Sequence, residues 1–427
     1  MKRIIIIALI SAFFSLNANE KNIEKKEEAK YLPTYYLEAD IDFSPYIGAE
    51  NLLTFHESIE KFLNWSLPIK PEMKFLYVSA RLLEMFLFWQ PLSELELVVQ
   101  HEVFGHGYRI RDIGSSRVKV RKYKIDLPQP YGKGGGATNY NFNSDLTSFQ
   151  VTAISSAGVE ATAILANRIK MKWALSLRVD PKKSILYFQA QHDLTNYVLS
   201  MDNSIFFADT GHDIEGYLIW LNNTYTDDNL TKSDLKIASL INFVDPTTYY
   251  TIGAFFYYIF TGKDISFPMI KIKDVRFLPN LRLGLTPFGP EYYLENFMSY
   301  KNRAIYSYFR AGKHNNNTYF GLGFEYPNLY KFNLNTLGFR ADIFYQPKIF
   351  SKSALFIFDN VQVGYSETDL NKMRFGISSY LIYDRKFSKK HEISFFSEVG
   401  YKSNGYVAGF SLKKGLIFRL GIGLGSF

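Results

Sequence analysis

The strongest constraint on the fold is the alternation of apolar and polar residues in the last third of the chain. From about Phe267 onward this period of two recurs in segments of roughly ten residues, which clusters of Asn, Gly, Pro, Lys and Asp separate. Segment 337–343 is apolar at every second position, and segments 319–326, 374–381 and 416–424 repeat the pattern. Because successive side chains of a strand point to opposite faces, these segments predict an antiparallel sheet with one apolar face and one polar or small face.

Segments of this length, rich in Tyr and Phe, are typical of a transmembrane β-barrel, whose outward side chains meet lipid. A soluble sandwich or a lipocalin-like barrel shows similar alternation, but so aromatic an outward face would promote aggregation in water. The last segment also resembles the assembly signal of bacterial outer-membrane proteins, because an amphipathic strand precedes the terminal Phe427, although that residue is in phase with the glycines. We therefore predict a transmembrane barrel of roughly eight to twelve strands.

The N-terminus has the composition of a secretory signal. Lys2 and Arg3 precede an apolar run, and Ala18 ends a short stretch suited to cleavage. We expect residues 1–18 to be a signal peptide and residues 19–33 to be a charged, flexible leader. Removal of the signal peptide lowers the formal net charge from +8 to about +6. This modest charge does not indicate a nucleic-acid partner.

The remaining chain divides by its periodicity into a mainly helical region, residues 34–263, and the predicted barrel, residues 264–427. The apolar runs 82–88 and 252–260 are too short to be membrane-spanning helices, so no inner-membrane anchor is indicated. The chain contains no cysteine, so any metal must be bound by nitrogen and oxygen atoms.

The strongest chemical signal is the segment 101–106, which reads H-E-V-F-G-H. In the H-E-x-x-H signature of zinc proteases, two histidines four residues apart lie about 40° apart around a helix and share one metal ion. His101 and His106 are five residues apart, which separates them by about 140° on an ideal helix. Both can face one ion if the helix contains a π-bulge, and Gly105 is well placed to accommodate it. The segment thus predicts a bulged helix with a metal site.

This H-E-x-x-G-H string resembles the signature of the dipeptidyl peptidase III family of zinc metallopeptidases, which has the same inserted residue and the same glycine. The resemblance covers about eight residues. It implies that His101 and His106 bind Zn²⁺ and that Glu102 is the general base. The Glu-Glu-Cys motif of that family is absent, so its substrate class is not carried over. Alternatively, both histidines are satisfied polar residues at a helix interface and Glu102 is a solvated or capping carboxylate.

Glu160 is the candidate for a third metal ligand. It lies in an apolar stretch where an unpaired carboxylate would be costly to bury. The stretch resembles the S-x-x-x-E-x-x-A portion of the third-ligand helix in several glutamate-type zinc peptidases, although Ile164 replaces the aspartate that follows in that pattern. An ion pair of Glu160 with an arginine, Arg109 or Arg168, is the alternative.

Helix boundaries are predicted from capping signals. Ser93, with a glutamate three residues later, indicates a start for the helix that carries the histidines, and Thr147 with Gln150 indicates a start for the helix that carries Glu160. Further amphipathic helices are expected at residues 184–200, 214–222 and 233–260.

Several other residues are candidates for supporting roles. Tyr108 and His192 are candidates for stabilising an oxyanion or orienting a metal ligand. His192 precedes Asp193, and His212 precedes Asp213, so each pair joins an imidazole to a carboxylate. For each pair an ordinary surface location is the favoured interpretation, because such neighbours are common.

A glycine-rich run at residues 132–137 leads into the segment 138–142. It lacks the Lys-Ser/Thr of a phosphate loop and the spacing of a dinucleotide fingerprint. We interpret it as a flexible loop before an edge strand, to which an extended peptide could add by backbone hydrogen bonds.

Together these features predict an α+β chain, with a helical metallopeptidase-like N-terminal domain followed by an antiparallel transmembrane β-barrel. We expect an exported protein of the outer membrane of a Gram-negative bacterium, in contact with outer-membrane lipid and acting on a peptide or protein substrate with Zn²⁺ as cofactor. An ester or amide of a lipid headgroup is the other substrate considered. The alternatives are a non-enzymatic pore, adhesin or scaffold with a structural metal or none, and a soluble periplasmic hydrolase.

Overall fold

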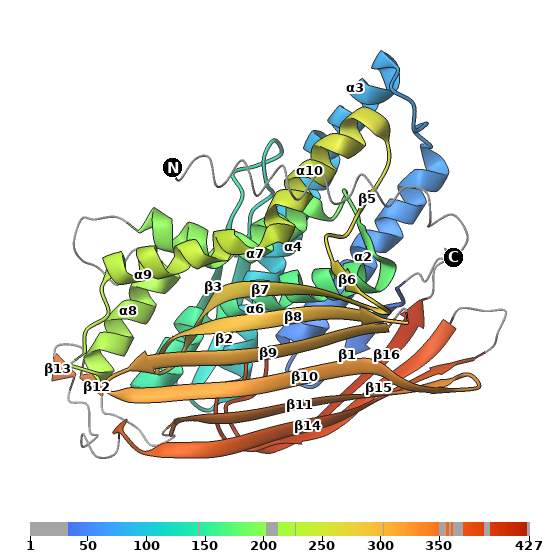
Figure 1. Ribbon diagram of the computed structural model, residues 1–427. Helices are drawn as coiled ribbons and strands as arrows, with labels where there is room; N and C mark the ends of the chain where they lie inside the picture. The colour runs from blue at the N-terminus through green and yellow to red at the C-terminus, as the bar shows by residue number, and fades with distance from the viewer. Residues whose placement is uncertain are drawn as a thin grey trace, which may run out of the picture.

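The computed structural model describes residues 33–143, 146–201, 212–226, 228–301, 303–349, 356–357, 360–361, 370–387 and 393–424. The predicted signal peptide, all but the last residue of the predicted leader, and Phe427 lie outside these residues. Within them the chain is α+β: a layer of helices covers one face of a large antiparallel sheet (Figure 1).

The first long helical segment runs without a break from Phe75 to Ile113 and contains two π-helical turns. Its elements are α3 (Phe75–Glu84), η2 (Met85–Trp89), α4 (Gln90–His101), η3 (Glu102–His106) and α5 (Gly107–Ile113). The predicted helix start at Ser93 is therefore wrong. The π-helical turn η2 directly precedes Pro91, whose nitrogen has no hydrogen to donate, and the helix continues through it.

Three of the other predicted helices are confirmed as α6 (Ser148–Ser176), α7 (Ser184–Ser200) and α8 (Asp213–Thr224). The single helix predicted over residues 233–260 is wrong, because the span is divided into α9 (Lys232–Ser239), the 3₁₀ turn η5 (Leu240–Val244) and α10 (Pro246–Thr261). Pro246 has no N–H with which to continue a helix from the preceding turn. A further helix, α2 (Pro45–Ser66), precedes them. Thr147 caps α6 as expected, because its hydroxyl accepts the N–H of Gln150 while the Gln150 side chain accepts the N–H of Thr147.

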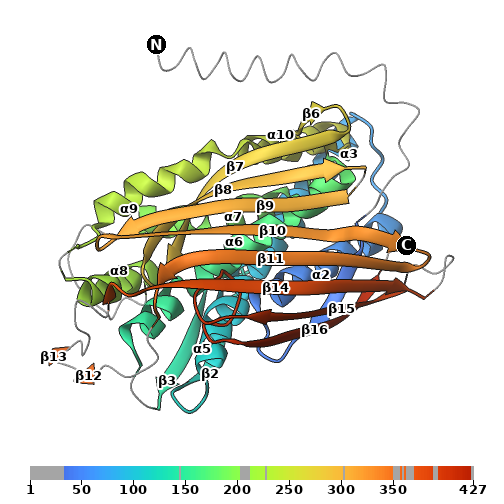
Figure 2. The same ribbon diagram turned by 60° about the horizontal axis from the view of Figure 1, so that its bottom comes forward.

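Ten strands form the large sheet, in the order β1-β16-β15-β14-β11-β10-β9-β8-β7-β6 (Figure 2). Their bounds are β1 (Tyr35–Ala39), β6 (Ile270–Ile272), β7 (Val275–Thr286), β8 (Gly289–Tyr300), β9 (Arg303–His314), β10 (Asn317–Phe332), β11 (Asn335–Pro347), β14 (Met373–Lys386), β15 (Ile393–Lys402) and β16 (Gly415–Leu424). All neighbours are antiparallel. Over the described residues the sheet is open, with β1 and β6 as its edges, so the predicted barrel is present only as a curved sheet.

Three small pairs of strands complete the described structure. They are β2 (Val118–Ile125) with β3 (Gly136–Phe142), β4 (Arg178–Val179) with β5 (Ile265–Ser266), and β12 (Phe356–Ile357) with β13 (Asn360–Val361). The glycine-rich run thus lies in the connection between β2 and β3 and at the start of β3, as the sequence predicts.

The large sheet has its polar face turned inward. On β10 the side chains of Phe320, Leu322 and Phe324 are exposed, whereas Tyr319 before them and Glu325 after them are buried. The neighbouring strands continue this arrangement, with buried Arg310, Arg340, Asp342, Glu398 and Arg419. A soluble sandwich would place its apolar residues inside, so the observed polarity is the reverse of that alternative.

Helix α6 is the central element of the helical layer. It packs against α2, α7, α8 and the π-turn η3 and also contacts β7, β8 and β9. Arg168 on α6 donates to Glu50 on α2 and to Glu325 on β10, which ties both layers together. By length and composition α6 could cross a membrane, but 89% of its most apolar window is buried within the protein, as expected of a core helix.

A buried ion network anchors the connection between β15 and β16 to the helices. Arg109 is 0% exposed and donates to Asp112 at 3.0 Å, to Glu160 at 2.9 Å and to the carbonyl of Phe410 at 3.0 Å. The N–H of Gly409 also donates to Glu160. Every charge in this network is buried and paired. Loss of one partner would leave the others buried without an interaction that compensates for their lost hydration.

We predict that Arg109→Met destabilises the fold by about 3–5 kcal/mol, because it leaves two buried carboxylates without their cation. The exposed pair of Lys124 with Asp126 is the control, and Lys124→Ala should cost less than about 1 kcal/mol. Denaturant titration of both variants, followed by tryptophan fluorescence, measures the difference. Equal effects of the two substitutions would contradict the anchoring role of Arg109.

Candidate metal centre

The π-helical turn η3 brings the two histidines of the motif together. The N–H of Gly107 donates to the carbonyl of Glu102, five residues earlier, which is the bond of a π-helix. The additional residue rotates His106 back toward His101, and their Nε2 atoms lie 3.1 Å apart. The bulge predicted from the five-residue spacing is confirmed.

Hydrogen bonds at the other ring nitrogens fix how each imidazole is protonated. Nδ1 of His106 lies 2.7 Å from the carbonyl of Ile154, which can only accept a hydrogen bond, so this nitrogen is the donor. Nδ1 of His101 lies 2.9 Å from a carboxylate oxygen of Asp193 and is also the donor. In the neutral form of each ring, the Nε2 atom therefore carries a lone pair.

Asp213, the first residue of α8, supplies a third acceptor. Its Oδ2 atom lies 2.9 Å from Nε2 of His101 and 3.0 Å from Nε2 of His106. Two nitrogen lone pairs and a carboxylate oxygen thus converge on one point. Such a convergence is stable only when a positive charge, either protons or a metal cation, lies among the three atoms.

The pKa values of the group also indicate that a positive charge is favoured among its three residues. Burial opposes protonation of His101, but the carboxylates of Asp193 and Asp213 outweigh it and raise the pKa of His101 well above its ordinary value of 6.5. Burial also opposes protonation of His106, whose pKa Asp213 nevertheless raises. Burial would raise the pKa of Asp213, yet the two histidines hold that pKa below its usual range.

The donor set fits a zinc ion better than a harder cation. Two imidazoles and one carboxylate are a usual ligand set of catalytic zinc, which keeps its fourth position open. Bonds of about 2.1 Å in a tetrahedron separate ligand atoms by about 3.4 Å, so the observed separations of 2.9–3.1 Å require an outward shift of only a few tenths of an ångström. The bond from His101 to Asp193 is the carboxylate contact that typically orients a zinc-binding histidine.

A second group, the carboxylates of Glu57, Glu60 and Asp180, has possible ligand atoms within 4.8 Å of one another. The ammonium of Lys183 already binds all three carboxylates. This group therefore has its cation within the chain and does not need a metal.

Two further side chains border the histidine and aspartate group. The Thr138 hydroxyl on β3 lies 2.6 Å from Oε2 of Glu102, the residue after His101, and fixes the direction of that carboxylate. The ring of Tyr197 on α7 stacks on His101, with 5.1 Å between ring centroids, and its hydroxyl lies 3.4 Å from Nε2 of His101. Burial, with the nearby carboxylates of Asp213 and Asp193, raises the pKa of Tyr197, so this hydroxyl keeps its proton.

Two glycines allow α6 to approach the π-turn closely. A methyl group on Gly158 would lie 2.1 Å from Nε2 of His101, and one on Gly105 would lie 2.7 Å from the backbone of Gly158. We predicted that Gly105 accommodates the bulge, and the structure gives it a second role, as the place where η3 touches α6. A side chain at either position would push η3 away from α6 and so separate His106 from the carbonyl of Ile154.

Glu160, the predicted third ligand, lies away from this group. Its carboxylate accepts hydrogen bonds from Arg109 at 2.9 and 3.2 Å and from the N–H of Gly409. This is the arginine pairing that we considered as the alternative. Asp213 takes the place of Glu160 beside the histidines.

Neither Tyr108 nor His192 borders the group. Tyr108 lines a surface depression with Asp40 and Phe410. His192 stacks on Phe243 and lies 2.9 Å from the hydroxyl of Thr248, and burial lowers its pKa to about 4.

The aspartates at the metal centre come from two dipeptides, His192-Asp193 and His212-Asp213, for which we favoured an ordinary surface location. That interpretation is wrong for both aspartates, because Asp193 reaches His101 and Asp213 reaches His101 and His106. The N-terminal position of Asp213 on α8 carried a signal, because acidic residues favour the first turn of a helix. No sequence signal identified Tyr197 or Thr138.

No protein-family model matches this chain, and no curated protein or solved structure matches it either. The residues of the site and their geometry are therefore what indicates a function.

We predict that Gly158→Ala weakens zinc binding about 10–100-fold, because the added methyl group displaces the His101 ring from its orienting bond. The matched control is Gly253→Ala on α10, where a methyl group would meet nothing within 4 Å. That control should keep its zinc affinity and gain about 0.5–1 kcal/mol of stability. Competition with a chelating dye measures the affinity, and an unchanged value for Gly158→Ala would show that the close approach is not needed.

Proposed function

We propose that this protein is a membrane-associated zinc-dependent hydrolase, most simply a metallopeptidase, in which His101, His106 and Asp213 hold the ion. One observation carries the proposal: two buried imidazole nitrogens and a half-buried carboxylate oxygen converge, and the other ring nitrogen of each histidine already binds an acceptor. The resemblance of segment 101–106 to a zinc-peptidase signature supports the same conclusion independently of the geometry.

The chemistry follows from the side chains around the group. A zinc ion held there would lower the pKa of a water molecule toward neutrality and polarise a carbonyl. Glu102, fixed by Thr138, would accept a proton from the attacking water and pass it to the leaving amine. The protonated hydroxyl of Tyr197 would donate to the carbonyl oxygen as negative charge develops on it. Tyr197 thus replaces Tyr108 and His192 as our candidate for that role.

Strand β3 is a suitable surface for an extended substrate. It contacts the π-turn through Thr138 and Gly136, where a methyl group on Gly136 would lie 2.9 Å from the side chain of Glu102. In the described part of the chain β3 pairs only with β2, which leaves its other edge for main-chain hydrogen bonds. This edge favours a peptide over a lipid headgroup as the substrate.

We predict about one zinc ion per chain in the purified protein, as measured by elemental analysis. His106→Ala should lose the metal, whereas Glu102→Gln should retain it and lose about 10²–10⁴-fold in peptide hydrolysis, because only proton transfer is removed. His192→Gln is the control for substitution of a buried histidine and should keep its zinc.

Absence of zinc from the intact protein, even after supplementation, would overturn the hydrolase proposal. The chain would then be a non-enzymatic scaffold in which protons shared with Asp213 and Asp193 satisfy the two histidines. Zinc that survives in His106→Ala would show that the ion is bound elsewhere.

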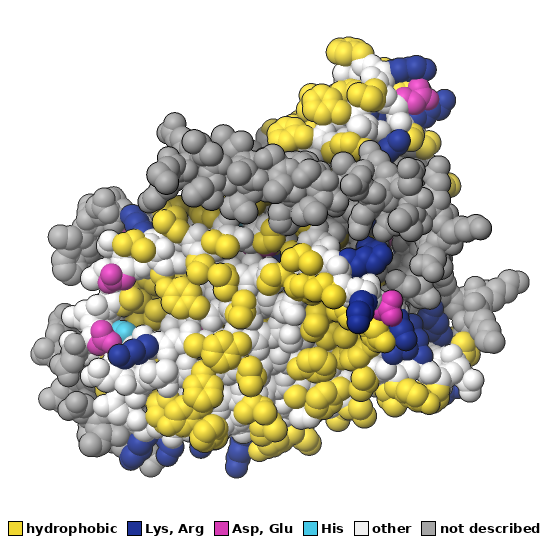
Figure 3. All heavy atoms as spheres, in the orientation of Figure 1, with side chains coloured by type: hydrophobic (Ala, Val, Ile, Leu, Met, Phe, Trp, Pro, Cys, Tyr) yellow, Lys and Arg dark blue, Asp and Glu magenta, His cyan; other side chains and the backbone are white. Residues whose placement is uncertain are grey.

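We further propose that the outer face of the large sheet contacts the lipid of a bacterial outer membrane, to which the N-terminal signal would direct the chain. Hydrophobic side chains cover much of this face (Figure 3). The exposed residues of the sheet include Leu294, Phe309, Phe320, Leu322, Phe324, Ile343, Phe375, Ile377, Leu381, Val399, Phe418 and Ile422. A patch this large is an aggregation hazard in water and is typical of a lipid-facing wall.

Strand length and edge design support this proposal. β10, β11 and β14 have 16, 13 and 14 residues, more than the 9–11 that a tilted strand needs to cross a bilayer. A spanning sheet must have its edges paired or covered, and both edges of this sheet are short, with five residues in β1 and three in β6. Closure of these edges into a barrel is the finer part of the proposal.

We predict that Leu322→Arg prevents stable association with outer-membrane lipid vesicles, because a cation on the lipid face costs about 2–4 kcal/mol near the bilayer centre. Ile237→Arg on α9, which is also exposed but lies off the sheet, is the matched control and should associate normally. Vesicle flotation measures both. A wild-type protein that stays in solution without detergent would contradict the membrane proposal and favour the soluble periplasmic hydrolase.

A further inference from the structure

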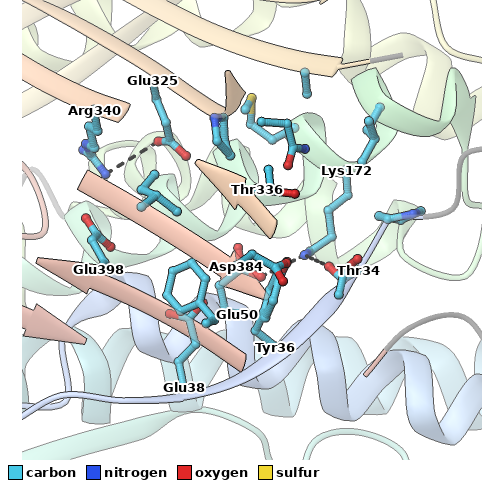
Figure 4. A pocket seen from close by; sticks show the side chains of 18 of the residues that line it. Thr34, Tyr36, Glu38, Glu50, Lys172, Glu325, Thr336, Arg340, Asp384 and Glu398 are labelled. Atoms are coloured by element: carbon cyan, nitrogen blue, oxygen red, sulfur yellow. Dashed lines mark hydrogen bonds and ion pairs between the residues drawn. The ribbon is translucent and has the colours of Figure 1, made fainter. Parts of the chain in front are cut away.

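A second cavity lies between the inner face of the sheet and the helices α2 and α6. It has a volume of about 570 Å³ and is lined by residues of β1, β10, β11 and β14 to β16 (Figure 4). On α6 it begins at Arg168, ten residues beyond Gly158 of the metal centre, which is about 15 Å along the helix axis. Its size lies within the range of small-molecule sites, and it is independent of the proposed hydrolase activity.

Some charges that line this cavity are satisfied within the chain. Glu50 accepts hydrogen bonds from Arg168 at 2.7 Å and from Lys172 at 2.8 Å. Glu325 accepts from Arg168 at 2.5 Å and lies 3.7 Å from Arg340. On this side both carboxylates already have cationic partners within the chain, so no cationic ligand is needed there.

The opposite side carries carboxylates without enough donors. Glu398 is 5% exposed, and although Arg419 donates to its Oε2 atom at 2.8 Å, its Oε1 atom has no partner among the described residues. Glu38 is 9% exposed and contacts Asn51 only through its own backbone, so no described residue donates to its carboxylate. Asp40 shares the same guanidinium at 3.5 Å. Arg419 is thus shared by Glu398 and Asp40, while the carboxylate of Glu38 has no hydrogen-bond donor among the described residues.

These unpaired oxygens lie together in the fold. Glu38 on β1 is opposite Gly421 of β16, and Glu398 on β15 is opposite Arg419 of β16. Gly421 and Arg419 are successive inward-facing residues of β16, so the two carboxylates flank the same part of that strand. Figure 4 shows the two side chains on the same side of the cavity. The ring of Phe396 also lines the cavity and offers an aromatic face to a cation.

The rim of the cavity has the opposite charge. Lys331 at the end of β10 and Lys386 at the end of β14 both line the cavity and are exposed, and with the single carboxylate of Asp384 near them they give this end a net positive charge. A ligand that carries only positive charge would be repelled there. A ligand with an ammonium group at one end and a carboxylate at the other matches both the interior and the rim.

We propose that this cavity binds an amino acid or a short peptide, whose ammonium group is received by Glu38 and Glu398 and whose carboxylate is met by Lys331 and Lys386. A buried carboxylate recovers its lost hydration when an ammonium group donates to it. The two exposed lysines set the orientation of the ligand by long-range attraction.

Isothermal titration of the full-length His106→Ala protein with trialanine tests this proposal, because that variant cannot cleave the probe at the metal centre. We expect one site per chain, and at least tenfold weaker binding of N-acetyl-trialanine, which lacks the ammonium group. Putrescine, which lacks a carboxylate, should also bind more weakly than trialanine. These comparisons use one protein and do not depend on whether a further variant folds.

Variants then locate the site. Glu38→Gln and Glu398→Gln, each added to His106→Ala, should weaken trialanine binding at least tenfold, whereas Glu72→Gln at the exposed pair with Lys74 should not. No binding of trialanine, equal binding of its N-acetyl form, tighter binding of putrescine, or unchanged affinity in both cavity variants would each overturn the proposal. The zinc measurement tests the residues of the metal centre, none of which lines this cavity. A negative result with trialanine would therefore leave the hydrolase proposal unaffected.

Discussion

The contact between helix α6 and the π-turn η3 is the constraint on which the candidate site depends. Where the two helices touch, Gly105 meets the backbone at Gly158, and Gly158 in turn leaves room for the ring of His101. Only at this separation does the carbonyl of Ile154 reach Nδ1 of His106. The bulge sets the rotation of the two histidines, and the glycine contact sets how both rings are held.

Helix α6 also links the site to the sheet. Its N-terminal half faces the histidines, while Arg168 and Lys172 in its C-terminal half reach Glu50 of α2, and Arg168 also reaches Glu325 of the sheet. The sheet offers polar and charged side chains to these partners because its apolar residues face outward. Buried ions therefore add to the apolar contacts between the layers, which join α6 to Leu278 and Phe297 of the sheet. The cavity beside α2 is lined by these charged side chains.

The inverted polarity of the sheet and the zinc-type donor set are physically compatible. A wall that presents apolar side chains outward can enclose a polar interior, and a polar interior tolerates the buried carboxylates that orient His101. The open edges β1 and β6 distinguish the described sheet from a complete barrel. The N-terminal strand β1 extends the sheet beside β16, so the sheet includes a strand that precedes all the described helices in the chain.

The sequence by itself determined the local features: the period-two strands, the capped start of α6 at Thr147, and the bulge implied by the five residues from His101 to His106. Each of these depends on residues close in the chain, where periodicity and capping rules apply. The helix start at Ser93 was wrong because the apolar residues upstream continue the helix through a π-turn that no capping rule reveals. Only the tertiary structure decided which carboxylate meets the histidines. The sequence favoured Glu160, but Arg109 binds that carboxylate, and the packing of α8 against α6 brings Asp213 to the histidines instead. Partners distant in sequence are chosen by packing and charge together.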